Sequence, residues 1–261
     1  MACAVKNITG FTQNTCGVHL LRTMMYPEVC ALFDAVAPNE GLSAYKRAIV
    51  EDNCLGKKSD SARKLTFRHL CELYTLDKDA LLFRGLRFFW DVAQKNKPLL
   101  TLLCAYNRDP VLRQSYALIQ TKSVGQPISN AETEDYLDSV WPDRFSASTL
   151  ESAAHHCNGT WTVAGYLKGR RNKVRTKPEI TPEAVSYALF IEYLRGTRGM
   201  MMFHSEMIKL LECGTDNAIQ LAHEAARKGM LVLKHVDDVI EATFPMLVTD
   251  EEMEAIHEQN S

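Results

Sequence analysis

The sequence predicts a mainly α-helical protein with two folded parts, a helical domain over residues 1–167 and a winged-helix-like domain over 179–261. Three observations support this division. Apolar residues recur at helical spacing as far as residue 167, without the alternation of a strand. A dense run of basic residues then predicts a linker over 168–178. Beyond it, three helical segments precede two alternating stretches that predict one β-hairpin.

The helices of the first part each begin near a proline or a capping residue. We expect helices at 27–37, 42–51, 61–74, 77–92, 98–106, 110–119, 129–141 and 149–167. Ser59 and Ser61 are alternative caps for the third of them, and Ser129 with Glu132 forms a capping box for the seventh. The segment 98–106 is the most apolar of all, so we expect it at the centre of the first core.

The part after the basic run has the order of elements found in a winged helix. Thr181-Pro182-Glu183 predicts the start of a helix that ends at Gly196, and further helices start at Ser205 and Thr215. Alternating stretches at 230–236 and 239–244 then flank Asp237-Asp238, a hairpin signal. In a winged helix the third helix reads the DNA and the hairpin is the wing.

The formal net charge of −2 conceals a strong segregation of charge along the chain. Residues 1–147 carry +2, residues 148–167 carry −1, residues 168–177 carry +6, and residues 178–261 carry −9. A near-neutral total therefore does not exclude nucleic-acid binding, because the electric field is local. The C-terminal tail, with Asp250-Glu251-Glu252 and Glu254, opposes non-specific binding.

The run from 168 to 177 contains no acidic residue. Its basic residues are Lys168, Arg170, Arg171, Lys173, Arg175 and Lys177. Burial of unpaired cations in a low-dielectric core costs several kcal/mol each, so we expect this run on the surface. A polyanion is the natural partner of such a surface. The alternative is a solvated junction between two domains.

Two further sets of residues are candidates for DNA contact. Arg63, Lys64 and Arg68 form a basic patch on one predicted helix, close in sequence to Lys57 and Lys58. On the third helix of the C-terminal part, the side chains able to reach base edges are Asn217, Gln220 and Arg227. Asp216 and Glu224 on the same helix would repel phosphates, so protein docking is the alternative for this part.

Catalytic and cofactor motifs are absent from the sequence, which contains no P-loop, no Gly-x-Ser-x-Gly elbow, no Gly-x-Gly-x-x-Gly and no His-Glu-x-x-His. His155 and His156 are adjacent and point about 100° apart on a helix, which disfavours a shared metal ion.

The eight cysteines are scattered without a Cys-x-x-Cys pair, so we expect a reducing cytoplasm. No apolar run reaches the roughly 18–20 residues of a membrane span.

Several short motifs follow one another in order between Thr9 and Leu167. They are Thr9-Gly10 ahead of Leu20 and Leu21, Ser61-Ala62-Arg63-Lys64, Leu99–Ala105, Ile128-Ser129 before Glu132–Leu137, and Phe145-Ser146-Ala147-Ser148-Thr149. In this order the chain resembles the BrxA family of small helical proteins from BREX bacteriophage-exclusion systems. The resemblance implies a helical core similar to the antitermination factor NusB and binding of double-stranded DNA as one component of phage defence. The segment from Lys168 onward departs from shorter members, so either part could contain the DNA-binding surface.

These observations predict a non-enzymatic, cytoplasmic protein that needs no cofactor and binds double-stranded DNA mainly through phosphate contacts, within a defence assembly that contains the catalytic partners. The alternative is an adaptor whose acidic C-terminal part holds a basic protein partner and never touches DNA.

Overall fold

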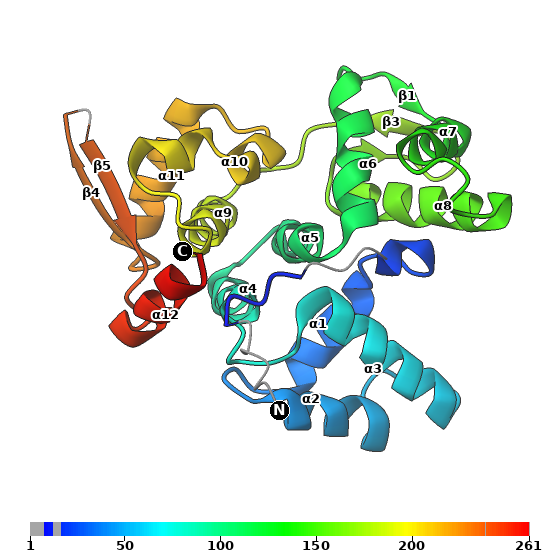
Figure 1. The fold of residues 1–261 in the computed structure, drawn as a ribbon, viewed down its shortest axis with the longest axis horizontal. Coiled ribbons are helices and arrows are strands. Elements are labelled where there is room, and N and C mark those ends of the chain that lie inside the picture. Colours follow the sequence, from blue (N-terminus) through cyan, green and yellow to red (C-terminus); the bar gives the residue numbers. More distant parts are fainter. Residues whose placement is uncertain (1–7, 13–16, 238, 261) are drawn as a thin grey trace. The chain divides into compact units, whose positions relative to one another are not determined.

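The computed structural model describes residues 8–12, 17–237 and 239–260, the last four by their backbone alone. Its secondary structure is mainly α-helical with short antiparallel strands, which confirms the predicted fold class (Figure 1). The chain forms two compact units. We call residues 12–76 with 104–179 the sheet unit, and residues 1–11, 77–103 and 180–261 the wing unit.

These units divide the chain differently from the predicted domains. The boundary between 179 and 180 lies beside the predicted start of the second domain at 179. Residues 77–103, however, belong with the C-terminal segment, so the predicted domain over 1–167 contributes to both units. Apolar burial explains this difference, because the face of the helix at 81–92 packs on a helix that follows residue 180.

The helices of the sheet unit follow the predicted ranges closely. In the first segment they are η1 (Val18–Leu20), α1 (Tyr26–Ala35), α2 (Leu42–Lys46), the π-helix η2 (Arg47–Glu51) and α3 (Asp60–Tyr74). In the second they are the end of α5 (Lys97–Arg108), α6 (Pro110–Thr121), α7 (Asn130–Val140) and α8 (Ala147–Val163). Ser59 caps α3, and Ser129 with Glu132 forms the predicted capping box of α7.

The core of the sheet unit contains a cluster of aromatic rings. Trp161 of α8 stacks on Tyr116 of α6 with ring centroids 5.4 Å apart, and it meets Tyr166 edge to face at 4.9 Å. The indole N–H of Trp161 donates to Ser115 Oγ at 2.8 Å, so the polar tip of this buried side chain is satisfied. Tyr166 belongs to the segment that follows α8, so the cluster joins this segment to the core.

The predicted linker over 168–178 is part of a small sheet. Strands β1 (Pro127–Ile128), β2 (Leu167–Lys168) and β3 (Lys173–Arg175) are antiparallel in the order β1-β3-β2. The long helix expected to reach Leu167 therefore ends at Val163, where Gly165 at φ +89° reverses the chain into β2. The pattern of apolar residues did not predict these strands, because two or three residues are too short to show alternation.

The wing unit contains the predicted order of three helices and a hairpin. Its elements are α4 (Leu81–Val92), the start of α5, α9 (Pro182–Leu194), the 3-10 helix η3 (Gly199–His204), α10 (Glu206–Leu210), α11 (Thr215–Arg227), β4 (Val232–Val236), β5 (Val239–Thr243) and α12 (Asp250–Asn260). Helix α4 packs closely on α9, since a Cβ atom at Gly85 would lie 2.6 Å from the ring of Phe190. The hydroxyl of Tyr187 donates to the carbonyl of Leu82 at 2.9 Å.

The acidic tail forms the helix α12. Thr249 and Glu252 form a reciprocal capping pair at the start of α12, a signal present in the sequence. The Glu252 carboxylate also accepts two hydrogen bonds, each 2.9 Å, from the guanidinium of Arg84 on α4. Of the turn residues expected in the hairpin, Asp237 adopts φ +51° and Asp238 lies outside the described residues.

Among the described residues, no helix combines the length and the apolar character needed to cross a lipid bilayer.

Candidate nucleic-acid interface

The basic segment occupies both strands and the turn of the β2–β3 hairpin. Register partners in an antiparallel pair share a face of the sheet. Leu167 and Arg175 are partners on the buried face, whereas Lys168 and Val174 are partners on the face that solvent reaches. The alternation of the strands therefore directs Lys168 to the face opposite that of Arg175.

A tight turn separates the two strands. Gly169 adopts φ +105°, and a Cβ atom there would lie 2.2 Å from the carbonyl oxygen of Asn172. Only glycine fits this position without a rearrangement of the turn. Arg170 and Arg171 follow it in the turn and are exposed. The sequence marks Gly169 as a helix breaker, but its role in presenting these two arginines emerges from the hairpin geometry.

Arg175 is buried, with 4% of its surface exposed. Its guanidinium donates to the carbonyl oxygens of Ile119 at 3.2 Å, Tyr166 at 3.3 Å and Thr176, and lies 5.7 Å from the Tyr166 ring centroid. Burial lowers the pKa of Arg175. The expectation that the whole run lies on the surface is wrong for this residue, because carbonyl groups and an aromatic ring replace water around its charge.

Lys173 is half-buried on the same face as Arg175. Its Nζ donates to Thr162 Oγ1 of α8 at 2.9 Å, and burial lowers the pKa of Lys173. Thr162 was not a predicted site residue, and no sequence signal connects it with Lys173. These contacts tie β3 to the body of the sheet unit, so the strand supports the turn rigidly.

The cations that remain on the surface are Lys168, Arg170, Arg171 and Lys177. Within the described residues, none of these four forms an ion pair. The same holds for other exposed cations among the described residues, such as Arg22, Lys46, Arg47 and Lys78, whereas further cations at or near the surface have a carboxylate partner. Such pairs are Lys57–Glu28, Lys64–Asp60, Lys122–Glu132, Arg195–Glu206, Lys228–Glu183 and Lys234–Glu241. The hairpin is therefore a site where positive charge stays uncompensated.

The second predicted basic patch is largely compensated. Lys64 Nζ lies 2.7 Å from Asp60, and Arg68 Nε lies 3.7 Å from Glu72, both one helical turn apart on α3. Arg63 donates to the carbonyl of Val50 at 2.8 Å. Helix α3 belongs to the sheet unit, at the opposite end from β2 and β3 (Figure 1).

The predicted base-reading residues lie on α11 of the wing unit. Asn217, Gln220 and Arg227 are exposed, and the amide of Asn217 donates to Cys213 Sγ at 3.3 Å. His223 of the same helix contacts His235 of β4, with Nε2 and Nδ1 3.1 Å apart. The structure thus places the basic run and the patch on α3 on the sheet unit, and the predicted base-reading residues on the wing unit.

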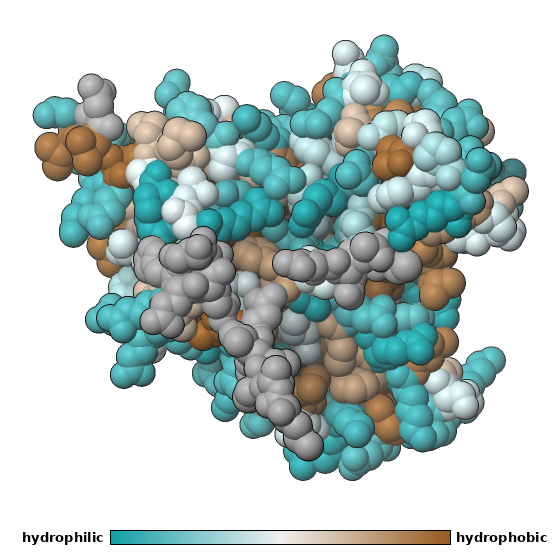
Figure 2. All heavy atoms as spheres, viewed as in Figure 1, coloured by the Kyte–Doolittle hydropathy of each residue, from teal (hydrophilic) through white to brown (hydrophobic). Residues whose placement is uncertain are grey.

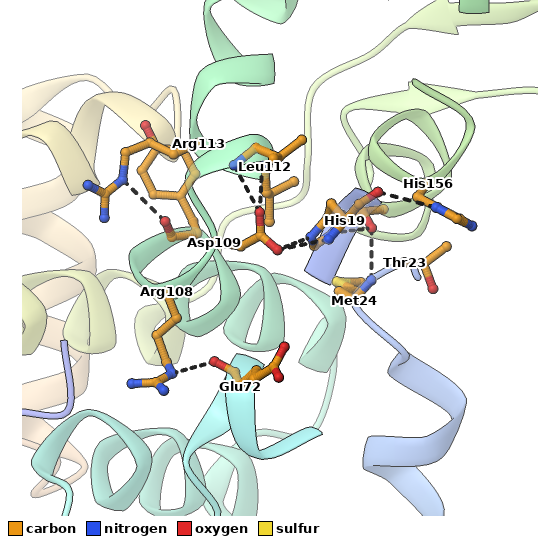
Figure 3. A network of polar contacts seen from close by, with 12 residues as sticks. His19, Thr23, Met24, Glu72, Arg108, Asp109, Leu112, Arg113 and His156 are labelled. Carbon is orange, nitrogen blue, oxygen red and sulfur yellow. Dashed lines mark hydrogen bonds and ion pairs between the residues drawn. The ribbon is translucent and has the colours of Figure 1, made fainter. Parts of the chain in front are cut away.

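A buried carboxylate, imidazole and hydroxyl form a chain in the sheet unit, of which Figure 3 labels the first two, Asp109 and His19. Asp109 Oδ2 lies 2.9 Å from His19 Nδ1, and His19 Nε2 lies 2.9 Å from Thr160 Oγ1. Such a series resembles a nucleophilic triad, but Asp109 is 1% exposed and the other two are fully buried. Thr160 Oγ1 also accepts the backbone N–H of Met24 at 2.9 Å. These contacts hold η1 against α6 and α8, and the hydroxyl cannot reach a substrate.

The histidine pair considered for metal binding is arranged differently. His156 Nδ1 donates to the carbonyl of His19 at 3.2 Å, and its ring lies edge to face with that of His155. Among the described residues, no three His, Cys, Asp or Glu side chains converge on a point where they could hold a metal ion.

No protein-family model matches the sequence, and no curated protein matches it.

Proposed function

We propose that this protein is a non-enzymatic, double-stranded DNA-binding component of a BREX-type phage-defence system, and that it binds mainly through phosphates. The observation that carries the DNA binding is the β2–β3 hairpin with the residues directly after it, where four exposed cations lack a carboxylate partner among the described residues. The assignment to phage defence rests on the resemblance to the BrxA family alone.

The physical argument for DNA is electrostatic. A phosphate backbone gains most from cations that need not first break an ion pair, and Lys168, Arg170, Arg171 and Lys177 satisfy this condition. Because Gly169 fixes the turn and Lys173 anchors β3, the backbone that carries the two arginines is positioned before binding. Less side-chain and loop entropy is then lost on association.

Salt dependence tests this proposal. Binding that neutralises four phosphates gives a log–log slope of about −3.6, at about −0.9 per phosphate. Affinity for a duplex measured by fluorescence anisotropy should therefore fall on the order of a hundredfold between 50 and 200 mM salt. Changing Lys168, Arg170, Arg171 and Lys177 together to alanine should bring the slope close to zero.

A matched variant on the same unit serves as the control. Changing Arg63, Lys64 and Arg68 to alanine removes three basic residues that already have intramolecular partners. This variant should keep most of the slope. If the quadruple hairpin variant folds and binds with the original slope, the proposal is wrong and the hairpin charges have another purpose.

A specific observation also favours the adaptor. The hairpin of the wing unit exposes Val236 by 69% and Val239 by 72%, and Figure 2 shows hydrophobic residues gathered at this end of the hairpin. Exposed apolar side chains on an acidic segment suit a protein partner. Changing both valines to threonine should weaken capture of a protein partner and leave DNA affinity unchanged.

A further inference from the structure

We propose that the turn 169–172 inserts Arg170 and Arg171 into the minor groove, so that the protein favours A·T-rich duplexes through the shape of the groove. This inference rests on the DNA binding proposed above. It adds which groove is entered and which class of sequence is preferred.

The sheet topology decides which part of the hairpin can enter a groove. A free two-stranded ribbon fits the major groove, which is about 12 Å wide. Here β3 is the middle strand and pairs with β1 as well as with β2, so the ribbon is not free. Its inner face is also covered, since Leu167 and Arg175 are buried. The turn extends beyond the paired residues, and its side chains suit the minor groove, which is about 6 Å wide.

The two residues in the turn are both arginine. The guanidinium group is planar and more weakly hydrated than an ammonium group, so it loses less on leaving water. A·T tracts have a narrow minor groove with an enhanced negative potential, which attracts inserted arginines. Lys168 directly precedes the turn and is exposed, so it can contact a phosphate beside the groove, whereas Lys177 is exposed beyond β3, at the other end of the hairpin, and can contact a phosphate farther along the duplex.

This arrangement adds a way to distinguish sequences to the phosphate contacts proposed above. An irregular linker would present its charges in many geometries and would respond only to phosphates. In a turn defined by Gly169 and anchored through Lys173, both arginines start from one backbone conformation and point into a limited region. In the minor groove, guanine adds an amino group that A·T pairs lack, and this group obstructs an inserted guanidinium.

Affinities for four duplexes of equal length show which groove the protein contacts. They contain A·T, G·C, inosine·C or diaminopurine·T pairs at their centre. Inosine lacks the minor-groove amino group of guanine but keeps its major-groove edge, and diaminopurine adds this amino group to adenine. We expect A·T and inosine·C to bind about tenfold more tightly than G·C and diaminopurine·T. Equal affinity for inosine·C and G·C, with A·T different, would place the contact in the major groove and overturn the inference.

Three double variants assign the preference to the turn. Arg170→Lys with Arg171→Lys keeps the charge and should keep the salt slope, but it should lose the A·T preference. Arg170→Ala with Arg171→Ala should lose the preference and about 1.8 units of slope. Lys168→Ala with Lys177→Ala should lose the same slope and keep the preference. A preference that survives both arginine variants contradicts the inference.

The measurements distinguish failure of this inference from failure of the proposed function. If all four duplexes bind with equal affinity and the expected salt slope, DNA binding stands and groove insertion does not. If none of them binds, the proposed function fails, and the inference fails with it.

Discussion

The guanidinium of Arg175 lies over the ring of Tyr166 and donates to its carbonyl oxygen at 3.3 Å. Arg175 is therefore buried, and its charged side chain holds β3 to the core of the sheet unit. Lys173 of the same strand also faces inward, whereas Arg170 and Arg171 lie in the exposed turn, so the hairpin combines an anchored strand with a charged turn.

Arg175→Ala should destabilise the sheet unit by about 2–3 kcal/mol, because carbonyl groups would lose a charged donor in a buried site. Arg170→Ala should change the free energy of unfolding by less than about 0.5 kcal/mol, since its side chain is exposed. Urea unfolding of both variants checks this difference. A stable Arg175→Ala protein that loses one unit of salt slope would instead make Arg175 a phosphate ligand.

Trypsin should cut the native protein first after Arg170 or Arg171 and spare Arg175, which is paired in β3 and buried. The two fragments should remain associated through gel filtration. Residues 77–103 belong to the compact unit of residues 180–261, where Arg84 pairs with Glu252 and Tyr187 bonds to Leu82. Separation of the nicked fragments under native conditions would contradict this division of the chain.

Asp109→Ala should destabilise the protein by about 3 kcal/mol or more, because the carboxylate accepts the backbone N–H groups of His19 and Leu112 in a buried site. Gly17→Ala should also be costly, since a Cβ atom there would lie 2.1 Å from the Asp109 carboxylate. A double-mutant cycle tests the connection between the two sites. The cost of Gly17→Ala should largely disappear in the Asp109→Ala background, and two additive costs would argue against the steric conflict.

Acid should destabilise the protein through His69. Burial, with help from the charges of Arg22 and Arg68, lowers the pKa of His69 from 6.5. The unfolded chain then binds more protons, so this contribution to stability is complete above pH 6.5 and is lost as the pH falls through the folded pKa. Because the ring nitrogens of His69 have no partner within the described residues, His69→Phe should fold. It should show a smaller loss of stability between pH 7.5 and 5.5 in urea unfolding. An unchanged loss would exclude His69 as the cause.

Local signals in the sequence were sufficient for most helices and for the wing. Ser59 caps α3, Ser129 and Glu132 form the capping box of α7, and alternation predicts β4 and β5. These features depend on residues within one or two turns of each other, so a single sequence reveals them. Thr249 and Glu252 carry the capping signal of α12, but the acidic composition of this segment obscures the helix in the sequence.

The sequence by itself determined the helical class, the order of elements and the location of the densest positive charge, because these follow from local spacing and composition. The tertiary structure decided which cations remain in water. Arg170 and Arg175 are both arginines of the same basic run, yet Arg170 lies in an exposed turn and Arg175 lies on the covered face of β3. That difference arises because β3 pairs with Pro127 and Ile128 of β1, and because Arg175 donates to the carbonyl of Ile119. These partners lie more than forty residues away in the chain. Burial is set by such distant partners, and no local pattern contains them.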